Sequence, residues 1–354
     1  MTTSIFAFII VLGVLVFFHE LGHFLVARFF GVGVRTFSLG FGPRMFGRKI
    51  GITDYRVSAI PLGGFVRMVG EDPDAKLEPE EIPLSFTHKH VLKKIMIVAA
   101  GPLFNLLLAV LIFYAVFQVS GLFIRQPFVG SVEPNTPAYE AGLQPGDQVR
   151  AINNQPTENW EEMAAIISES QGDQLLFTIN RNDENLRITI TPKPMEDKNI
   201  FGETVTRYVI GITSSNEVVS KRLNPVEAFY ESIVQTYRIT ELTIVSIVKL
   251  IQGTLSTKTL GGPIMIAELA GQQAREGALN LVFFTALLSI NLAILNFLPI
   301  PVLDGGHLVF FSIELVRGKP VSTRVREIAQ QAGIFILLML MILVFYNDIS
   351  RIFF

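Results

Sequence analysis

Four stretches of the chain are apolar over a length that can cross a lipid bilayer: residues 5–27, 95–117, 279–298 and 328–346. A hydrocarbon core of about 30 Å requires roughly 20 such residues in a helix. The first stretch has no basic segment before it and no small-residue cleavage site after it, so we interpret it as a retained span. The pattern predicts an α-helical polytopic membrane protein with four transmembrane helices.

Residues 225–255 form a fifth apolar stretch of a different kind. Their apolar side chains recur at helical spacing. Charged residues interrupt the stretch: Glu231, Arg238, Glu241 and Lys249. This composition favours an interfacial amphipathic helix over a fifth span, which remains the alternative.

The basic residues predict the orientation of the chain, because Lys and Arg near span ends are retained on the cytoplasmic side. The loop between the first two spans is rich in them: Arg28, Arg35, Arg44, Arg48, Lys49, Arg56, Arg67, Lys89, Lys93 and Lys94. The loop before the last span contains Arg317, Lys319, Arg324 and Arg326. We therefore expect both loops in the cytoplasm, with residues 121–276 and both termini outside.

Composition supports the lipid bilayer as a partner of this chain. Half of the residues are hydrophobic and 17% are charged, against roughly 25% charged in soluble domains. The formal net charge of −2 gives no electrostatic basis for binding nucleic acid, and we expect none. Cysteine is absent, so any metal site must use His, Asp or Glu.

The first span contains the sequence His19-Glu20-Leu21-Gly22-His23. Two imidazoles four residues apart project from one face of a helix and can bind a single Zn²⁺ ion. Glu20 can then act as the catalytic general base while the metal polarises the scissile carbonyl of an amide. The alternative is that these side chains only pack one helix against another. Ionisable groups inside a span are costly, however, so the functional interpretation is preferred.

A catalytic zinc ion has three protein ligands and one open position. We predict that Asp304 is the third ligand, because it follows an apolar span and two prolines that break the helix. Irregular backbone of this kind can turn a carboxylate into a protein-lined cavity. His307 is the competing ligand, with capping or support of the site as its other role. His88 and His90 lie in a Lys-rich loop, where we expect them to be solvated.

The predicted topology supports this ligand set independently. His19 and His23 lie toward the inner end of a span that begins outside, and Asp304 follows the inner end of another such span. The three side chains therefore meet at one depth. A fifth span at residues 225–255 would instead carry Asp304 to the opposite face of the membrane.

Further motifs accompany the HELGH sequence in a fixed order along the chain. They are Ala-Ala-Gly-Pro at residues 99–102 followed by Asn105, Gly-Gly-Pro at 261–263, and residues 296–305. Together they resemble the site-2 protease family of intramembrane zinc metalloproteases, and specifically its bacterial regulator-of-sigma-E protease branch. The resemblance implies zinc ligation by His19, His23 and Asp304, with Glu20 as general base. It also implies that Asn296 helps to hold the substrate backbone.

In proteins of this family a hairpin after the first span dips toward the active site. Residues 52–69 have matching strand-and-turn character, so we predict a membrane-associated β-hairpin. Gly63, Gly64 and Phe65 would contact the substrate there. Hydrolysis of a helical segment requires local unwinding, and pairing with an edge strand replaces the lost hydrogen bonds. An ordinary cytoplasmic hairpin is the alternative.

Residues 128–192 alternate in strand fashion, and residues 141–153 resemble the PDZ signature. The signature places Leu143 and Ile152 in a core, a turn at Gly146 and Asp147, and a helix at residues 160–167. Bacterial PDZ domains are often circularly permuted, so the strand that binds a peptide C-terminus can come late. The predicted peptide groove consists of Tyr208, Val209, Ile210, Gly211 and Ile212. Three roles remain open for this domain: it can bind peptide ends, filter substrates by size, or act as a folded spacer without a ligand.

These features divide the chain into four segments. Residues 1–120 hold the HExxH span, the hairpin and the second span; residues 121–216 form one inserted α/β PDZ domain; residues 217–278 form the interfacial helix and a connector; and residues 279–354 hold the third span, the Asp304 loop and the fourth span.

The resulting prediction is an intramembrane zinc metalloendopeptidase of the bacterial inner membrane. Its substrates are single-span proteins, such as anti-sigma factors and remnant signal peptides, already cut on their outer side. Two alternatives come from other classes. A transporter should show inverted repeats, and we find none. A catalytically silent PDZ adaptor would not need the HExxH sequence together with Asp304.

Overall fold

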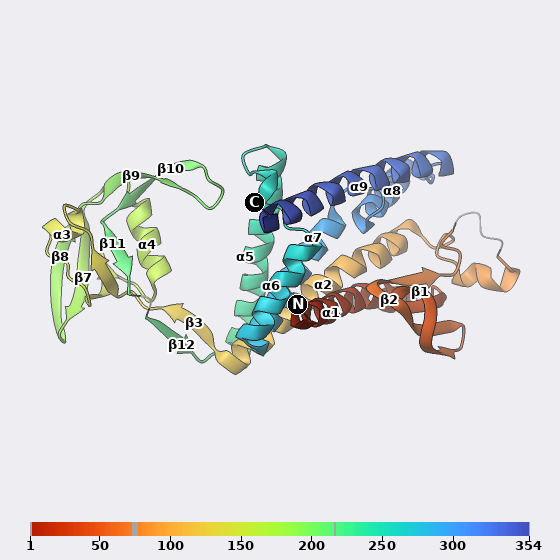
Figure 1. Cartoon of the computed structure of the whole chain (residues 1–354), viewed down its shortest axis with the longest axis horizontal. Coiled ribbons are helices and arrows are strands. Elements are labelled where there is room, and N and C mark those ends of the chain that lie inside the picture. The colour runs from red at the N-terminus through yellow and green to blue at the C-terminus, as the bar shows by residue number, and fades with distance from the viewer. Residues whose placement is uncertain (1, 73–76, 216, 354) are drawn as a thin grey trace. The chain divides into compact units, whose positions relative to one another are not determined.

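The computed structural model describes residues 2–72, 77–215 and 217–353. The chain forms two compact units. The membrane unit comprises Met1–Val116, Phe229–Val248 and Ser256–Phe354, and the β-rich unit comprises Phe117–Ala228 and Lys249–Leu255. Helix α5 (Pro225–Ile251) contributes residues to both units (Figure 1).

Helices dominate the membrane unit. Those long and apolar enough to cross a bilayer are α1 (Thr2–Phe29), α2 (Val91–Ser120), α7 (Ala278–Phe297) and α9 (Thr323–Phe353). They coincide with the four predicted spans in position, length and apolar composition, and α5 is not among the qualifying helices of the described residues. The shorter helices are α6 (Pro263–Glu276), α8 (Asp304–Arg317) and the 3₁₀ turns η1 (Pro79–Leu84) and η2 (Thr257–Thr259).

Three of the spans share an apolar core that holds α1 in place. Val11 and Leu15 of α1 pack with Leu108 of α2 and against leucines of α7. The backbones of α1 and α2 approach closely at Gly22, where a Cβ atom would lie 2.4 Å from the carbonyl oxygen of Ala100. Helix α6 packs along α1 and α7 (Figure 1).

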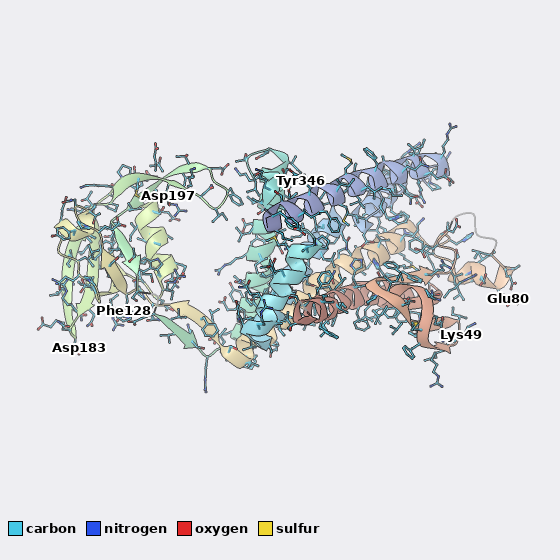
Figure 2. All side chains as sticks on the ribbon, viewed as in Figure 1. Lys49, Glu80, Phe128, Asp183, Asp197 and Tyr346 are labelled. Atoms are coloured by element: carbon cyan, nitrogen blue, oxygen red, sulfur yellow. The ribbon has the colours of Figure 1, made fainter. Side chains whose placement is uncertain are left out.

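The loop between α1 and α2 folds into a sheet made of β1 (Val34–Ile50) and β2 (Thr53–Met68). Residues 36–39 pair with residues 64–67 on one side and with residues 54–57 on the other, and residues 46–50 pair with residues 53–57. The two long strands therefore bend into four paired segments, with residues 64–67 at one edge. Lys49 marks the tip of this sheet (Figure 2).

The predicted hairpin at residues 52–69 is wrong in its pairing, because its two arms lie on opposite sides of residues 36–39. The turn signals at residues 61–64 indicated direct pairing between the arms. Residues 36–39 lie between the two arms instead, because Val34 and Phe37 are buried in a core with Ala27 at the end of α1. The hydroxyl groups of Ser38 and Ser58, 2.9 Å apart, tie this segment to the first arm.

Within the described residues, the β-rich unit contains short strands and two short helices of its own. Its strands are β3 (Leu122–Arg125), β4 (Val129–Val132), β5 (Gln148–Ile152), β6 (Gln155–Pro156), β7 (Leu175–Arg181), β8 (Glu184–Ile190), β9 (Lys193–Lys198), β10 (Thr204–Val209), β11 (Ile212–Ser214) and β12 (Val218–Lys221), and its helices are α3 (Pro137–Glu140) and α4 (Trp160–Glu169). The main sheet has the order β6-β5-β7-β8, and the remaining strands pair as β4 with β11, β9 with β10, and β3 with β12. The compact unit extends beyond residues 121–216 because β12 pairs with β3.

The local features predicted from the signature at residues 141–153 are present. Leu143 and Ile152 are buried in the core of this unit. Gly146 adopts a left-handed conformation, with φ of +93°, at the predicted turn. The predicted helix is α4, whose first turn is capped by Asn159 accepting a hydrogen bond from the Glu162 amide at 2.8 Å.

Candidate metal centre

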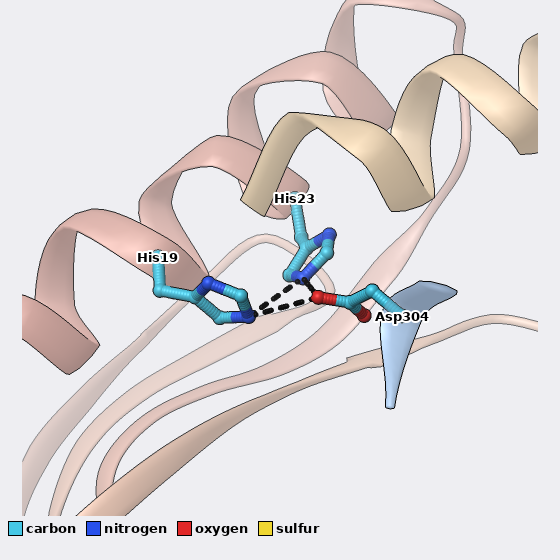
Figure 3. A group of neighbouring side chains, drawn as sticks. All are labelled: His19, His23 and Asp304. Atoms are coloured by element: carbon cyan, nitrogen blue, oxygen red, sulfur yellow. Dashed lines mark hydrogen bonds and ion pairs between the residues drawn. The ribbon is translucent and has the colours of Figure 1, made fainter. Parts of the chain in front are cut away.

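Helix α1 brings His19 and His23 together. The two residues are one turn apart, so both rings project from the same face, and their Nε2 atoms are 3.3 Å apart (Figure 3). Nδ1 of His23 lies 2.9 Å from the carbonyl oxygen of Ile97 in α2. A ring that donates from Nδ1 to a carbonyl keeps its lone pair on Nε2. The Nε2 atom of His23 is therefore able to bind a metal.

Helix α2 meets this face of α1 at a glycine. A Cβ atom on Gly101 would lie 2.3 Å from Nε2 of His23 and 2.9 Å from Cε1 of His19. A larger residue would occupy the space that the two imidazoles require. Sequence reasoning noted Gly101 within a motif but missed this role, because no local pattern shows which helix the motif faces.

Asp304 reaches the site from the start of α8. Helix α7 ends at Phe297, and the prolines of the following segment cannot continue it. A Cβ atom on Gly305 would lie 2.2 Å from the carbonyl oxygen of Leu298, and one on Gly306 would lie 2.3 Å from that of Ile300. These glycines let α8 begin directly against the preceding turn, which points the carboxylate of Asp304 at the imidazoles (Figure 3).

The three side chains have the spacing of a zinc site. Oδ2 of Asp304 is 3.1 Å from Nε2 of His19 and 3.6 Å from Nε2 of His23. Zinc bonds of about 2.0–2.1 Å at tetrahedral angles place two ligand atoms roughly 3.3 Å apart. Oδ2 of Asp304 is also buried without a hydrogen-bond partner among the described residues. A cation bound by the three atoms satisfies that oxygen, so the residues present fit a Zn²⁺ ion.

Glu20 lines the same cavity as the three ligands. The cavity has a volume of about 820 Å³ and extends from the ligands to charged side chains such as Glu71, Lys94 and Arg326. A Cβ atom on Gly64 would lie 3.2 Å from Cγ of Glu20, so the edge segment of the sheet passes beside this carboxylate. The site thus combines a metal group, a carboxylate that can accept a proton, and a cavity lined in part by charged side chains.

The surroundings of the cavity shift the pKa values of Asp304, His307 and Glu71. Burial raises the pKa of the Asp304 carboxyl, but the imidazoles of His19 and His23 lower it by more, so this pKa lies below its ordinary value. Asp304 is therefore ionised, as a zinc ligand must be. Desolvation lowers the pKa of His307 and raises that of Glu71.

The remaining histidines lie outside the metal group. His307 lines the cavity and contacts Phe310, but the group whose ligand atoms converge is His19, His23 and Asp304. His88 contacts the hydroxyl of Ser85, and Nδ1 of His90 accepts a hydrogen bond from a backbone amide at the start of α2. The geometry therefore favours Asp304 over His307 as the third ligand.

The residues predicted to contact the substrate lie in β2 and at the end of α7, and Phe65 lines the cavity. Gly63 has a φ of +150° and packs against the ring of Phe41, and Phe65 stacks on the same ring and lines the cavity. Gly64 lies between them, next to Glu20. Asn296 is the penultimate residue of α7. Asn296 is half-buried there, and its contact with the substrate stays a prediction.

The residues predicted to form a peptide groove belong to two strands and the link between them. Tyr208 and Val209 end β10 and pair with β9. Ile210 is buried, and the carbonyl oxygens of Ile210 and Gly211 already accept hydrogen bonds from backbone amides near α3. Ile212 begins β11 and pairs with β4. The groove itself stays a prediction.

Comparisons with known proteins cover nearly the whole chain. Residues 7–340 match the model of peptidase family M50. The chain is 37% identical to mll0638 of Mesorhizobium japonicum over 97% of both chains, and 40% identical to Cj1068 of Campylobacter jejuni over 98% of this chain and 93% of that one. It is 33% identical to the zinc metalloprotease RasP of Geobacillus kaustophilus over 99% of this chain and 98% of that one. The names of all three contain the term zinc metalloprotease.

The match includes both halves of the metal centre and the β-rich unit between them in sequence. A zinc-dependent peptidase family is consistent with the converging ligand atoms of His19, His23 and Asp304. The chain therefore belongs to peptidase family M50, the site-2 protease family, and is a zinc metalloprotease that uses Zn²⁺ as its cofactor.

Proposed function

We propose that this protease is an intramembrane endopeptidase that cuts the transmembrane segments of single-span proteins. The observation that carries the proposal is the position of the metal group. His19 and His23 lie within the spanning helix α1, and Asp304 follows the spanning helix α7. A metal site built from spanning helices acts on peptide bonds that lie in the membrane.

The chemistry follows from the groups around the cavity. Zinc, when bound, supplies a Lewis acid that polarises the scissile carbonyl and makes a water molecule nucleophilic at neutral pH. Glu20 takes the proton from that water and later returns it to the leaving amine. The ionised carboxylate of Asp304 and the imidazoles of His19 and His23 hold the metal, so Glu20 remains available for proton transfer.

The edge segment at residues 64–67 supports a way to present the substrate. Within the described residues its backbone pairs with residues 36–39 on one side only, and Phe65, Val66 and Met68 line the cavity. An unwound substrate strand pairs with the other side, which replaces the hydrogen bonds that the substrate helix loses. The side-chain amide of Asn296, at the end of α7, helps to hold the substrate backbone.

The orientation and the outer unit complete the proposal. The basic residues of the loops support an orientation with the catalytic zinc toward the cytoplasmic side of a bacterial inner membrane and with both termini and the β-rich unit outside. The β-rich unit is a PDZ domain that filters substrates by size or binds their C-termini. The family resemblance supports substrates such as anti-sigma factors and remnant signal peptides that a first protease has already shortened.

The test incubates the purified full-length chain with single-span segments in liposomes, and compares wild type, Glu20→Gln and a chelated sample. We expect cleavage to fall roughly 10²- to 10⁴-fold in Glu20→Gln with zinc still bound, because a positioned general base contributes about that factor. Chelation should abolish cleavage. Equal cleavage in all three samples would contradict the proposal.

A second substrate tests the unwinding step. In a matched segment, Gly and Pro residues near the cut are replaced by Leu and Ala, which form helices readily. This segment should be cut more slowly by the wild-type protein. An unchanged rate would exclude substrate unwinding as a requirement.

A further inference from the structure

Asn105 of α2 is a buried polar residue with one contact to the metal group. Its exposed fraction is 0%, and its side-chain nitrogen lies 3.4 Å from Nδ1 of His19. Its side-chain oxygen is buried without a hydrogen-bond partner in the part of the chain that the structure describes. A buried amide with an unsatisfied oxygen is costly unless it serves a purpose.

The backbone of Asn105 is held firmly at this position. Its carbonyl oxygen accepts a hydrogen bond of 2.7 Å from the hydroxyl of Ser289, a fully buried residue of α7. Asn105 is also one helical turn after Gly101, which faces both imidazoles. Contacts with α1 and α7 thus fix the amide next to the ring of His19.

The orientation of this amide decides which nitrogen of His19 can bind a metal. If the amide nitrogen donates to Nδ1, a neutral imidazole keeps its proton on Nε2, and Nε2 cannot be a ligand. Nε2 is the atom that faces Asp304, at 3.1 Å. A half-turn of the amide brings its oxygen to Nδ1, where it accepts the Nδ1 proton and leaves a lone pair on Nε2.

We propose that Asn105 is a positioning residue that selects the metal-binding tautomer of His19. Its amide can donate to Nδ1 in the metal-free protein and, after the half-turn, accept from Nδ1–H in the zinc-bound protein. The role matches that of the Ile97 carbonyl oxygen, which fixes the tautomer of His23 from the same helix. Each imidazole of the metal group is thus oriented by α2.

The proposal predicts that an acceptor at position 105 is required and that an amide is not. Asn105→Asp retains an acceptor for Nδ1–H, so its zinc affinity should equal or exceed that of wild type. Asn105→Leu has a similar volume and no acceptor, so its affinity should fall roughly 10- to 100-fold, the usual effect of losing a partner of a metal-bound histidine. A role in packing alone would give the opposite ranking, because Leu suits a buried site better than a carboxylate.

The measurement is the zinc dissociation constant of the full-length protein, determined by competition with a chromophoric chelator. It needs no substrate, so its outcome is independent of the proposed cleavage within the membrane. Asn347→Leu is the matched control: Asn347 is a buried asparagine of the membrane unit that donates to the carbonyl oxygen of Thr257 and does not contact the metal group. Its zinc affinity should stay within about 2-fold of wild type. Wild-type affinity in Asn105→Leu, or equal losses in the Asp and Leu variants, would overturn the proposal.

Discussion

Two aspartates, one in each unit, show what separates a structural carboxylate from a functional one. Asp147 of the β-rich unit is 1% exposed, and each of its oxygens accepts a 2.7 Å hydrogen bond from Arg181. One oxygen also accepts a bond from the Gln144 amide at 2.8 Å. In Asp304 of the membrane unit, one buried oxygen has no hydrogen-bond partner among the described residues. This oxygen faces the imidazoles of His19 and His23.

The difference lies in which group completes the site. The hydrogen bonds of Asp147 are made by its own unit, and those from Arg181 raise the pKa of that guanidinium. The site of Asp304 needs a cation from outside the chain. A buried carboxylate with a full set of partners stabilises a fold, whereas one that leaves an oxygen unsatisfied beside histidines indicates a metal site.

The largest effect should come from removing the functional carboxylate. Asp304→Ala leaves zinc with two protein ligands, so its affinity should fall by more than the roughly 100-fold loss typical of a supporting residue. Cleavage should disappear with it. The zinc content of the purified protein checks the first point. Unchanged zinc content would mean that Asp304 is not a ligand.

The glycine beneath the imidazoles should be nearly as sensitive. Gly101→Ala places a methyl group 2.3 Å from Nε2 of His23, so that ring must move out of its ligand position. We expect zinc affinity to fall roughly 10- to 100-fold, as when a metal-bound histidine is displaced from its support. Chelator competition measures the change. Gly13→Ala in the same unit is the matched control, because among the described residues no atom outside the adjoining turns of α1 lies within 4 Å of its added methyl group.

The structural carboxylate should affect stability alone. Asp147→Ala leaves the Arg181 guanidinium and the Gln144 amide without their acceptor, which should destabilise the β-rich unit by about 2–3 kcal/mol. The single tryptophan of the chain, Trp160, packs against the core of this unit, so its fluorescence reports unfolding of the unit in the full-length protein. Zinc affinity should not change. A loss of zinc in this variant would break the distinction between the two aspartates.

The smallest effect is expected at the competing histidine. His307 lines the cavity outside the converging ligand atoms, so His307→Ala should bind one zinc ion with an affinity within about 3-fold of wild type. Zinc stoichiometry and affinity both test this. A loss as large as that of Asp304→Ala would identify His307 as the ligand instead.

The sequence predicted which three side chains converge in the metal group because their signals are local. His19 and His23 share one helical face, and Asp304 follows prolines that must end a helix. The spans were predicted for the same reason, since a long apolar run is a property of one segment. The turn at Gly146 was recognised from neighbouring residues alone.

The features that sequence reasoning missed depend on contacts between distant segments. Asn105 contacts His19, which is 86 positions away in the sequence, and no pattern within α2 shows that contact. The pairing of residues 36–39 with both arms of the expected hairpin is also non-local. Local turn signals predict where a chain reverses, but burial against another element decides which strands pair.

The most direct measurement is X-ray absorption at the zinc K-edge of the purified wild-type protein and of His23→Ala. We predict one zinc ion per chain, with two imidazole nitrogens and carboxylate oxygen at about 2.0–2.1 Å in the wild type. In the variant, one imidazole contribution or the zinc itself should be lost. Wild-type zinc without imidazole scattering, or a spectrum that the substitution leaves unchanged, would contradict ligation by His19, His23 and Asp304.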